Sequence, residues 1–337
     1  MNIFDTSVLS RVVAEIPAPA PFFLNSFFPT IQTETSPEIH FDVANTTRRI
    51  APFVSPIVGG KVVAGQGYKT STFTPAYIKD KRVFDSTRPF KRLAGERIGG
   101  EMDPMARLNA TVVSELSDQI AMLTRRQELM ACETLRTGKV VIEGDLYPRV
   151  ELDFDRHADL TKGLLTTARW GETGVKPLAD IEAWSMLVTQ HSGATATTVV
   201  MDVKAWQMFS ASADVQKLLD RFRGADQLSP TVAGEGGRFM GTVGNFDIWV
   251  HAGWYAHPDT GVLTPYLPDH TVIITSPELE GTRAYGAIKD EEAGFQAMPY
   301  YSKSWVEPDP AVRYLLLQSA PLMVPYRVNA SFCATVR

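Results

Sequence analysis

The side chains with the most evident chemical potential gather in one stretch of the second half of the chain. His251, His257 and Asp259 lie in a β-rich run and the turn that follows it. Two imidazoles and a carboxylate are donors that zinc accepts. Their spacing matches no established zinc signature, and short patterns of this kind often arise by chance. The sequence therefore favours a structural or surface role for them, with a metal-dependent hydrolase as an alternative hypothesis.

Other combinations of reactive side chains are weaker. His191 stands beside Ser192, but neighbours in sequence rarely face each other and no GxSxG strand-turn-helix motif is present. Two pairs of acidic residues could in principle supply a general acid and a general base: Asp153 with Asp155, and Glu291 with Glu292. Isolated carboxylates on polar edges are normally solvated. We therefore expect no catalytic residue.

Cofactor and metal binding are also not indicated. No phosphate-binding GxxxxGK[ST] motif occurs, and the glycine-rich residues 234–241 follow no convincing strand, which predicts a flexible loop. The two cysteines, Cys132 and Cys333, are too few for a disulfide-stabilised secreted domain and are expected to be buried, reduced thiols. The sequence thus predicts neither a cofactor nor a metal site.

The composition predicts a folded protein with a small net charge. Of 337 residues, 44% are hydrophobic, and 33 Lys and Arg stand against 38 Asp and Glu, for a net charge of -5. Such a balance argues against disorder and against tight DNA binding by the whole surface. No signal peptide or membrane span is visible near the N-terminus, so we expect a soluble protein of a reducing compartment.

The elements that would position any site begin with an unusual N-terminal region. Residues 1–50 contain prolines at 17, 19, 21, 29 and 37, which should break regular structure, and two Phe-Phe pairs at 22–23 and 27–28. This predicts an arm whose apolar side chains dock elsewhere, on a neighbouring subunit for example. Residues 53–84 then read as two β-rich runs around Gly65 and Gly67, a long hairpin with exposed edge strands.

A long helix follows. Asp103 and Pro104 form a strong helix start, apolar residues recur at helical spacing from Leu108 to Leu123, and Gly138 provides a stop. The helix would extend roughly 50 Å over residues 104–137. The remainder alternates between element types. We expect a hairpin at 139–154, helices at 180–190 and 203–222, strands at 197–202, 246–256 and 270–277, and further strand in the tail at 313–328.

Several runs together resemble the major capsid proteins of phage lambda and its relatives. They are FFLNSFFP, FVSPIVGGKVVAGQGYKTSTFTPAYIKDK and SWVEPDPAVRYLLLQSAPLM, which occur in the same order along nearly the whole chain. The resemblance implies an α+β protein with the Hong Kong 97-type capsid fold. By that comparison the parts are an N-terminal arm (1–50), an extended hairpin loop (51–98), a peripheral domain with a spine helix (99–177 and 291–337) and an axial domain (178–290).

The resemblance also implies a function and partners. The chain would be a major capsid protein of a tailed double-stranded DNA bacteriophage, a structural protein that self-assembles into pentamers and hexamers of an icosahedral shell. Its partners would be copies of itself, a separate scaffold protein, a portal and a decoration protein, with DNA packaged by confinement and no membrane. It would occupy the virion, after assembly in the host cytoplasm.

Two further expectations concern a covalent link between subunits and an alternative structural role. Some relatives join subunits by a Lys-Asn isopeptide bond, and Lys61, Lys69 and Asn329 occupy the corresponding hairpin and tail regions. Nothing identifies a complete cross-linking set, so we predict no covalent link. Another phage structural protein, such as a tail tube subunit, is the main alternative because such proteins also use arms and hairpins.

Overall fold

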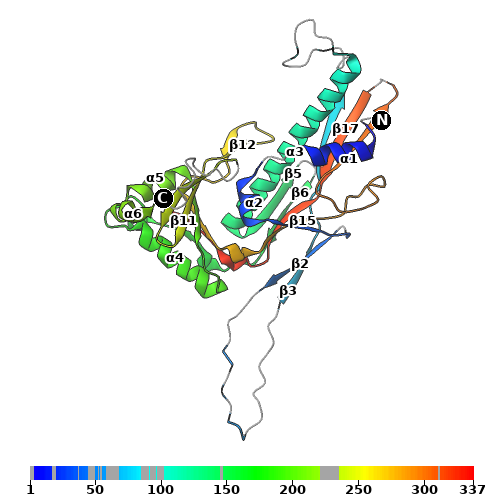
Figure 1. The fold of residues 1–337 in the computed structure, drawn as a ribbon. Helices are drawn as coiled ribbons and strands as arrows, with labels where there is room; N and C mark the ends of the chain where they lie inside the picture. Colours follow the sequence, from blue (N-terminus) through cyan, green and yellow to red (C-terminus); the bar gives the residue numbers. More distant parts are fainter. Residues whose placement is uncertain are drawn as a thin grey trace.

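The protein consists of two lobes and a projecting β-ribbon (Figure 1). The computed structural model describes residues 4–16, 20–36, 38–44, 50–51, 53, 55–57, 68–84, 91, 96, 102–144, 147–220, 235–309 and 312–337. One lobe is built along the long helix α3, and the other contains α4, α5 and α6 around a mixed sheet. This mixture of helices and largely antiparallel sheets confirms the predicted α+β class.

Helix α3 (Pro104–Thr137) is the spine of the first lobe, and its predicted bounds are confirmed. At its start the Asp103 carboxylate accepts a hydrogen bond of 2.6 Å from the Ala106 backbone N–H, as an N-cap does. At its end Gly138 has a φ of 70°, a left-handed conformation that costs glycine little. The Arg156 guanidinium donates to the Leu135 and Arg136 carbonyls at 2.7 and 2.6 Å, which satisfies two acceptors that a helix end leaves open.

A three-stranded antiparallel sheet packs on the N-terminal half of the spine. Its order is β16 (Tyr301–Glu307), β17 (Val312–Ser319) and β4 (Ile78–Phe84). Arg82 on β4 forms ion pairs with Glu115 and Asp118 of the spine at 3.2 and 2.8 Å. The sequence assigned residues 78–84 to the long hairpin. That prediction was wrong, because their actual partner β17 lies more than two hundred residues later.

The projecting ribbon pairs β2 (Ile39–Ala44) with β3 (Tyr68–Phe73) in antiparallel register. It points away from both lobes (Figure 1). The predicted partner for residues 68–73 was the run beginning at residue 53. Instead the partner precedes that run, and residues 53 and 55–57 belong to no strand. The predicted turn at Gly65 and Gly67 lies outside the described residues.

The N-terminal region departs most from expectation. It forms α1 (Thr6–Glu15), α2 (Phe22–Phe27) and β1 (Thr30–Thr33), the last parallel to β15 (Gly281–Tyr285). The prolines at 21 and 29 flank α2 instead of preventing it, since a proline at a helix boundary removes no intrahelical hydrogen bond. The prediction that the aromatic side chains of this region dock elsewhere was wrong: they are buried in the core of their own chain.

The second lobe is organised on a seven-stranded sheet. Its strands are, in spatial order, β7 (Thr161–Gly163), β19 (Ser331–Thr335), β14 (Thr271–Thr275), β8 (Thr198–Met201), β11 (Phe246–His251), β10 (Gly237–Val243) and β9 (Leu219–Asp220). Three helices pack against this sheet: α4 (Pro177–Ser192), α5 (Val203–Ala211) and α6 (Ala213–Leu218). Trp170, Trp184, Phe209 and Phe332 fill the core of this lobe.

Two predictions for this lobe need correction. The single helix expected over 203–222 is interrupted at Ser212, whose extended backbone separates α5 from α6. Residues 237–241 of the glycine-rich run, expected as a flexible loop, instead belong to β10. Glycine has a weak strand preference, so the local signal there was poor. The predicted strands at 197–202 and 270–277 are confirmed by β8 and β14.

Smaller elements complete the chain. The predicted hairpin after the spine is confirmed by β5 (Lys139–Gly144) and β6 (Tyr147–Asp153). The other short elements are β12 (Trp254–Ala256), β13 (Leu263–Pro265), β18 (Pro321–Pro325) and the 3-10 turns η2 (Ala158–Leu160), η3 (Thr166–Ala168), η4 (Pro277–Leu279) and η5 (Val328–Ala330). Cys132 and Cys333 are free and buried, as predicted. Across the described residues, every helix is too short or too polar to span a bilayer.

Candidate assembly interface

The candidate metal residues from the sequence do not form one site. His251 is buried on β11, where its ring centroid lies 4.7 Å from that of Phe23. Burial lowers the pKa of this imidazole to about 4, since desolvation disfavours its charged form. His257 and Asp259 lie in the exposed connection between β12 and β13, with His257 Nδ1 3.8 Å from Asp259 Oδ2. His251 is thus a core residue, apart from the other two.

The remaining candidates are also separated or engaged. The buried Ser192 hydroxyl donates to the Val188 carbonyl at 2.7 Å, so it does not face His191. Asp153 forms an ion pair of 2.9 Å with Lys139 across the β5–β6 hairpin. Glu291 and Glu292 are exposed in a turn. Their positions give no acid and base pair around a common cavity.

Residues 22–28, which we call the aromatic segment, are held at both ends by charged side chains. The buried Glu128 carboxylate of the spine accepts hydrogen bonds from the Phe23 and Leu24 N–H groups at 2.7 and 2.9 Å. Arg283 on β15 donates to the Phe28 and Leu24 carbonyls at 2.7 and 3.0 Å. Acceptor oxygens at the N-terminus and a guanidinium donor at the C-terminus of α2 satisfy its open backbone N–H and C=O groups.

Two glycines allow the aromatic segment to approach closely. A Cβ on Gly237 would lie 2.3 Å from Phe22 Cδ2, and one on Gly281 would lie 2.0 Å from the Phe27 carbonyl oxygen. Real atoms do not approach this closely, so any side chain at either position would displace the segment. The glycine-rich run that the sequence predicts as a loop is therefore a strand whose missing side chain accommodates Phe22.

A second apolar region is exposed in the part of the chain that the structure describes. Residues 50, 51, 53 and 55–57, which we call the loop segment, follow β2 in sequence, and Phe53 is fully exposed. Ile50 and Ile57 are each 93% exposed. Isolated exposed apolar residues are common, but several in a short stretch indicate a contact surface. The run FVSPIV, quoted above for its resemblance, begins at Phe53.

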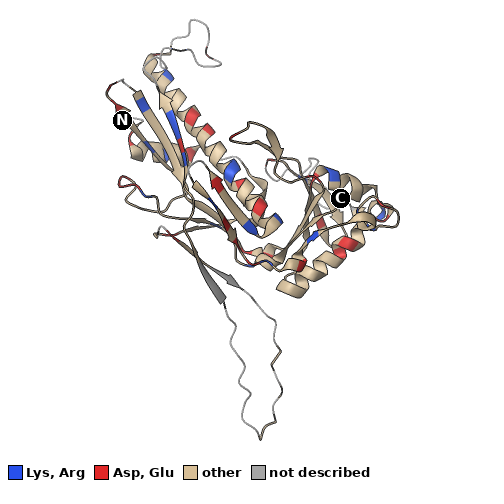
Figure 2. Ribbon diagram, turned by 180° about the vertical axis from the view of Figure 1, so that it is seen from behind, with Lys and Arg blue, Asp and Glu red and all other residues tan. Residues whose placement is uncertain are grey.

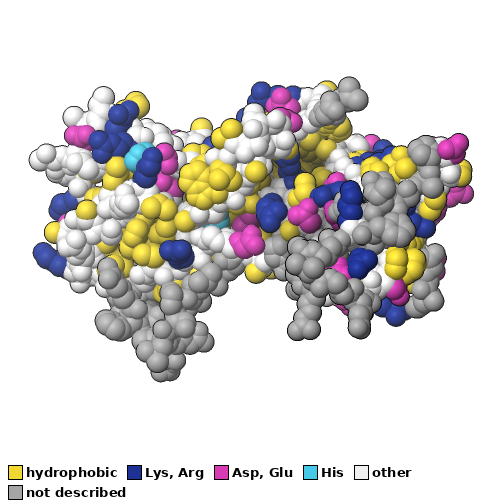
Figure 3. All heavy atoms as spheres, turned by 90° about the horizontal axis from the view of Figure 1, so that it is seen from above, with side chains coloured by type: hydrophobic (Ala, Val, Ile, Leu, Met, Phe, Trp, Pro, Cys, Tyr) yellow, Lys and Arg dark blue, Asp and Glu magenta, His cyan; other side chains and the backbone are white. Residues whose placement is uncertain are grey.

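The short β12–β13 hairpin presents another apolar surface that the sequence did not identify. Trp254, Val262 and Leu263 are each more than half exposed, and β12 pairs only with β13 within the described residues. Apolar side chains gather on the face seen from above, over the middle of the molecule where this hairpin lies (Figure 3). In the sequence, this hairpin was indicated only by the predicted strand at 246–256, which contains Trp254.

Sheet edges and charge suit protein contacts better than nucleic acid contacts. Within the described residues, β2 and β3 pair only with each other, and β4 is the outer strand of its sheet. Open edges can accept a strand of another chain. Acidic and basic side chains are interspersed along the spine (Figure 2). A surface of mixed sign lacks the dense positive charge that binds a phosphate backbone.

The fold and these surfaces define a class of protein: a structural subunit with a self-contained body and apolar, open-edged projections. The family model for "Phage major capsid protein E" matches residues 5–336, so the chain belongs to the phage major capsid protein E family. It is a structural protein of the capsid in the virions of tailed double-stranded DNA phages, and not an enzyme. The hydrolase and tail tube alternatives are thereby excluded.

Individual relatives agree with this assignment. The chain is 29% identical over 334 residues to the major capsid protein of Escherichia phage N15, with 96% of each chain covered. It is also 29% identical over 314 residues to the major capsid protein of Escherichia phage lambda, with 90% of each covered. The crystal structure of a prophage protein of Escherichia coli CFT073, assigned as a capsid protein, superposes with a TM-score of 0.78 at 24% identity over 99% of each chain. The Hong Kong 97-type fold is confirmed.

Proposed function

We propose that this chain builds an icosahedral shell by burying its loop segment and pairing its open strand edges against neighbouring copies. The observation that carries this proposal is the contrast in exposure between Phe53 and the four phenylalanines of the aromatic segment. The body of the subunit already buries the four phenylalanines of the aromatic segment. Contact with another molecule would remove the exposed side chains of the loop segment from water, and apolar burial favours that association.

In this proposal identical subunits close into rings of five and six through head-to-tail interfaces. The β2–β3 ribbon and the loop segment lie over adjacent subunits and join the rings. The proposed parts remain an N-terminal arm (1–50), an extended loop (51–98), a peripheral domain (99–177 and 291–337) and an axial domain (178–290). Residues 331–335 (β19) come from the tail range given to the peripheral domain, yet they pair with β14 in the seven-stranded sheet of the second lobe.

The proposed partners beyond the chain itself are a separate scaffold protein, a portal and a decoration protein, with assembly in the host cytoplasm. Open β edges near the ribbon support decoration there. The DNA would be confined, since the chain carries a net charge of -5. Tight, salt-sensitive binding of double-stranded DNA to the unassembled chain would contradict this part.

Electron microscopy of the chain produced together with its genomic neighbours tests the proposal directly. We expect closed, rounded shells. Phe53→Ser should leave soluble, folded subunits and few shells, whereas Phe53→Leu should assemble as the unaltered chain does. Open tubes from the unaltered chain, or full assembly of Phe53→Ser, would contradict the proposed role of the loop segment.

A further inference from the structure

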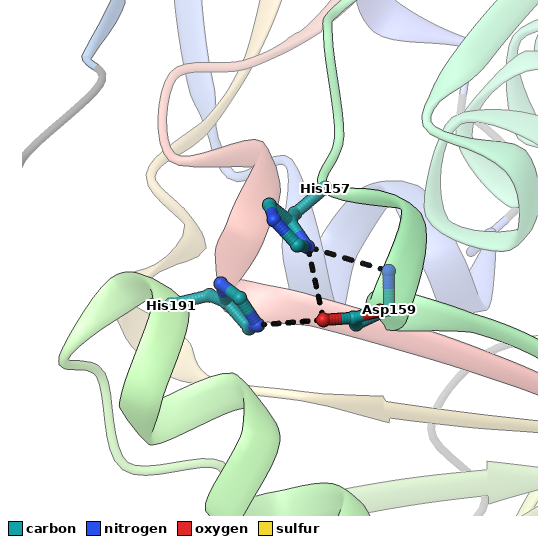
Figure 4. A group of neighbouring side chains, drawn as sticks. All are labelled: His157, Asp159 and His191. Carbon is teal, nitrogen blue, oxygen red and sulfur yellow. Dashed lines mark hydrogen bonds and ion pairs between the residues drawn. The ribbon is translucent and has the colours of Figure 1, made fainter.

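Two histidines and one aspartate that the sequence did not group lie together between η2 and the end of α4 in the second lobe. His157 and Asp159 flank and occupy the turn η2, and His191 belongs to the last turn of α4. The Asp159 carboxylate points between both imidazoles (Figure 4). Its Oδ2 lies 3.5 Å from His157 Nδ1 and 3.5 Å from His191 Nε2. Among the described residues, these three side chains form a group whose ligand atoms all lie within 4.8 Å of one another.

The two distances to Asp159 Oδ2 fit a tetrahedral metal ion. Zinc binds imidazole nitrogen and carboxylate oxygen at about 2.0 to 2.2 Å, with three protein ligands and an open fourth position in many sites. The corners of such a tetrahedron are separated by about 3.3 to 3.6 Å, from the same bond lengths. Both separations to Asp159 Oδ2 fall within that interval. Two direct hydrogen bonds would be shorter than 3.5 Å, so the carboxylate is not tightly bonded to either ring.

The surrounding chain orients the three side chains. The His157 backbone N–H donates to Asn329 Oδ1 at 2.9 Å, which fixes the turn against η5. Gly193, with a φ of 71°, ends α4 directly after this turn of helix. The two imidazole rings are stacked, with centroids 3.9 Å apart, so binding of both nitrogens to one tetrahedral ion would turn the rings apart from this arrangement. The Asp159 N–H donates a long hydrogen bond of 3.3 Å to His157 Nδ1, and metal binding at that nitrogen would replace it.

We propose that one divalent transition metal ion, preferably zinc, binds to His157 Nδ1, Asp159 Oδ2 and His191 Nε2. This replaces the sequence expectation that the chain has no metal site. Imidazole favours zinc over magnesium or calcium, which prefer oxygen ligands. The bound ion would join the turn η2 to the end of α4, two elements that pack in the core of the second lobe. Solvent, or a side chain of another subunit, would occupy the fourth position.

The chain contains its own control for this site. His257 and Asp259 repeat the His-x-Asp arrangement, with a backbone hydrogen bond of 3.3 Å from the Asp259 N–H to His257 Nδ1. Nδ1 and Oδ2 are 3.8 Å apart there. Within the described residues, that pair belongs to no group of three potential ligands. Two ligands bind a metal ion far more weakly than three do. His191, the third ligand, should therefore make the affinity of the first site higher than that of the His257–Asp259 pair.

The test is a titration of the purified full-length chain with zinc alone, followed by calorimetry and by the thermal unfolding midpoint. We expect one zinc ion per chain, a higher midpoint in its presence, and unchanged behaviour in His257→Ala. His191→Ala and the isosteric Asp159→Asn should each weaken binding by roughly tenfold or more, because each removes one of three ligands. Circular dichroism without metal shows whether each variant is folded.

Cobalt provides a readout that separates this site from nonspecific histidine binding. Co²⁺ in a tetrahedral site absorbs visible light much more strongly than the hydrated ion does. We expect that absorption in the unaltered chain and in His257→Ala, and its loss in folded Asp159→Asn. The proposal is overturned if zinc affinity is the same in folded Asp159→Asn as in the unaltered chain, or if the His257→Ala change weakens binding as much as His191→Ala does.

Discussion

The aromatic segment and the loop segment lie close in sequence and share an apolar character, yet they have opposite environments. Phe28 is completely buried, beside Gly281 of β15, whereas Phe53 is completely exposed. The first is held by Glu128 and Arg283 and fits beside two glycines. No comparable set of contacts surrounds the described residues of the loop segment. Apolar composition alone therefore does not distinguish a side chain that stabilises the subunit from one that is available to its neighbours.

The largest expected effect on subunit stability comes from the aromatic segment. Phe28→Ala should lower the free energy of unfolding of the unassembled chain by about 3 to 5 kcal/mol, since it leaves a cavity in a packed core. Phe53→Ala is the matched control, the same chemical change at an exposed position. It should alter stability by no more than about 0.5 kcal/mol. Urea denaturation of both variants checks this, and equal losses would refute the contrast.

A smaller effect on stability should follow pH through Glu128. Burial raises the pKa of this carboxyl to about 7 in the folded chain, from an ordinary value of 4.5. The folded state therefore binds the proton more tightly than the unfolded state does. Its contribution is fully present below pH 4.5 and is lost as the pH rises through 7. The size of the change is about 3 kcal/mol, by the usual conversion of a pKa difference.

The measurement is urea denaturation of the unassembled chain at a series of pH values from 4.5 to 8.5, compared with Glu128→Gln. Glutamine cannot titrate, so the stability of the unaltered chain should fall relative to that of the variant as the pH rises from 4.5 to 7. Other carboxyl groups contribute equally to both chains and cancel in the difference. Parallel curves for the two chains would show that Glu128 does not titrate as proposed.

The smallest expected effect on the free subunit, and the largest on assembly, comes from the loop segment. Phe53→Ser should leave the urea midpoint unchanged while the yield of sedimenting shells falls several-fold, since the buried area is lost only between subunits. Light scattering during assembly measures this. Loss of shells together with loss of subunit stability would mean that Phe53 supports the body, contrary to its exposure.

The sequence predicted features that local chemistry determines. The spine helix was predicted with the correct ends because Asp103, Pro104 and Gly138 act within a few residues of the boundary they set. The β5–β6 hairpin was predicted for the same reason. Strand partners were predicted less well, since β4 pairs with β17 far along the chain, and alternation within one strand does not specify its neighbour.

Long-range packing explains the other errors. Buried aromatic side chains at 22–28 look the same in sequence as exposed ones in an arm, and the difference depends on Glu128, Arg283 and Gly281, which come from distant elements. The glycine at 237 reads as flexibility until Phe22 is placed against it. The His157 group could have been suspected from its His-x-Asp spacing, but His257 has the same spacing. Only the fold brings His191 to the first of these pairs.

The central claim, that the loop segment is buried between subunits, can be tested by chemical labelling. Ser55→Cys introduces a thiol among exposed residues, while both native cysteines are buried, and burial raises the pKa of the Cys333 thiol to about 11. Maleimide should therefore react at residue 55 alone. We expect rapid labelling of free subunits and strong protection in assembled shells. Equal labelling rates in subunits and shells would contradict the account.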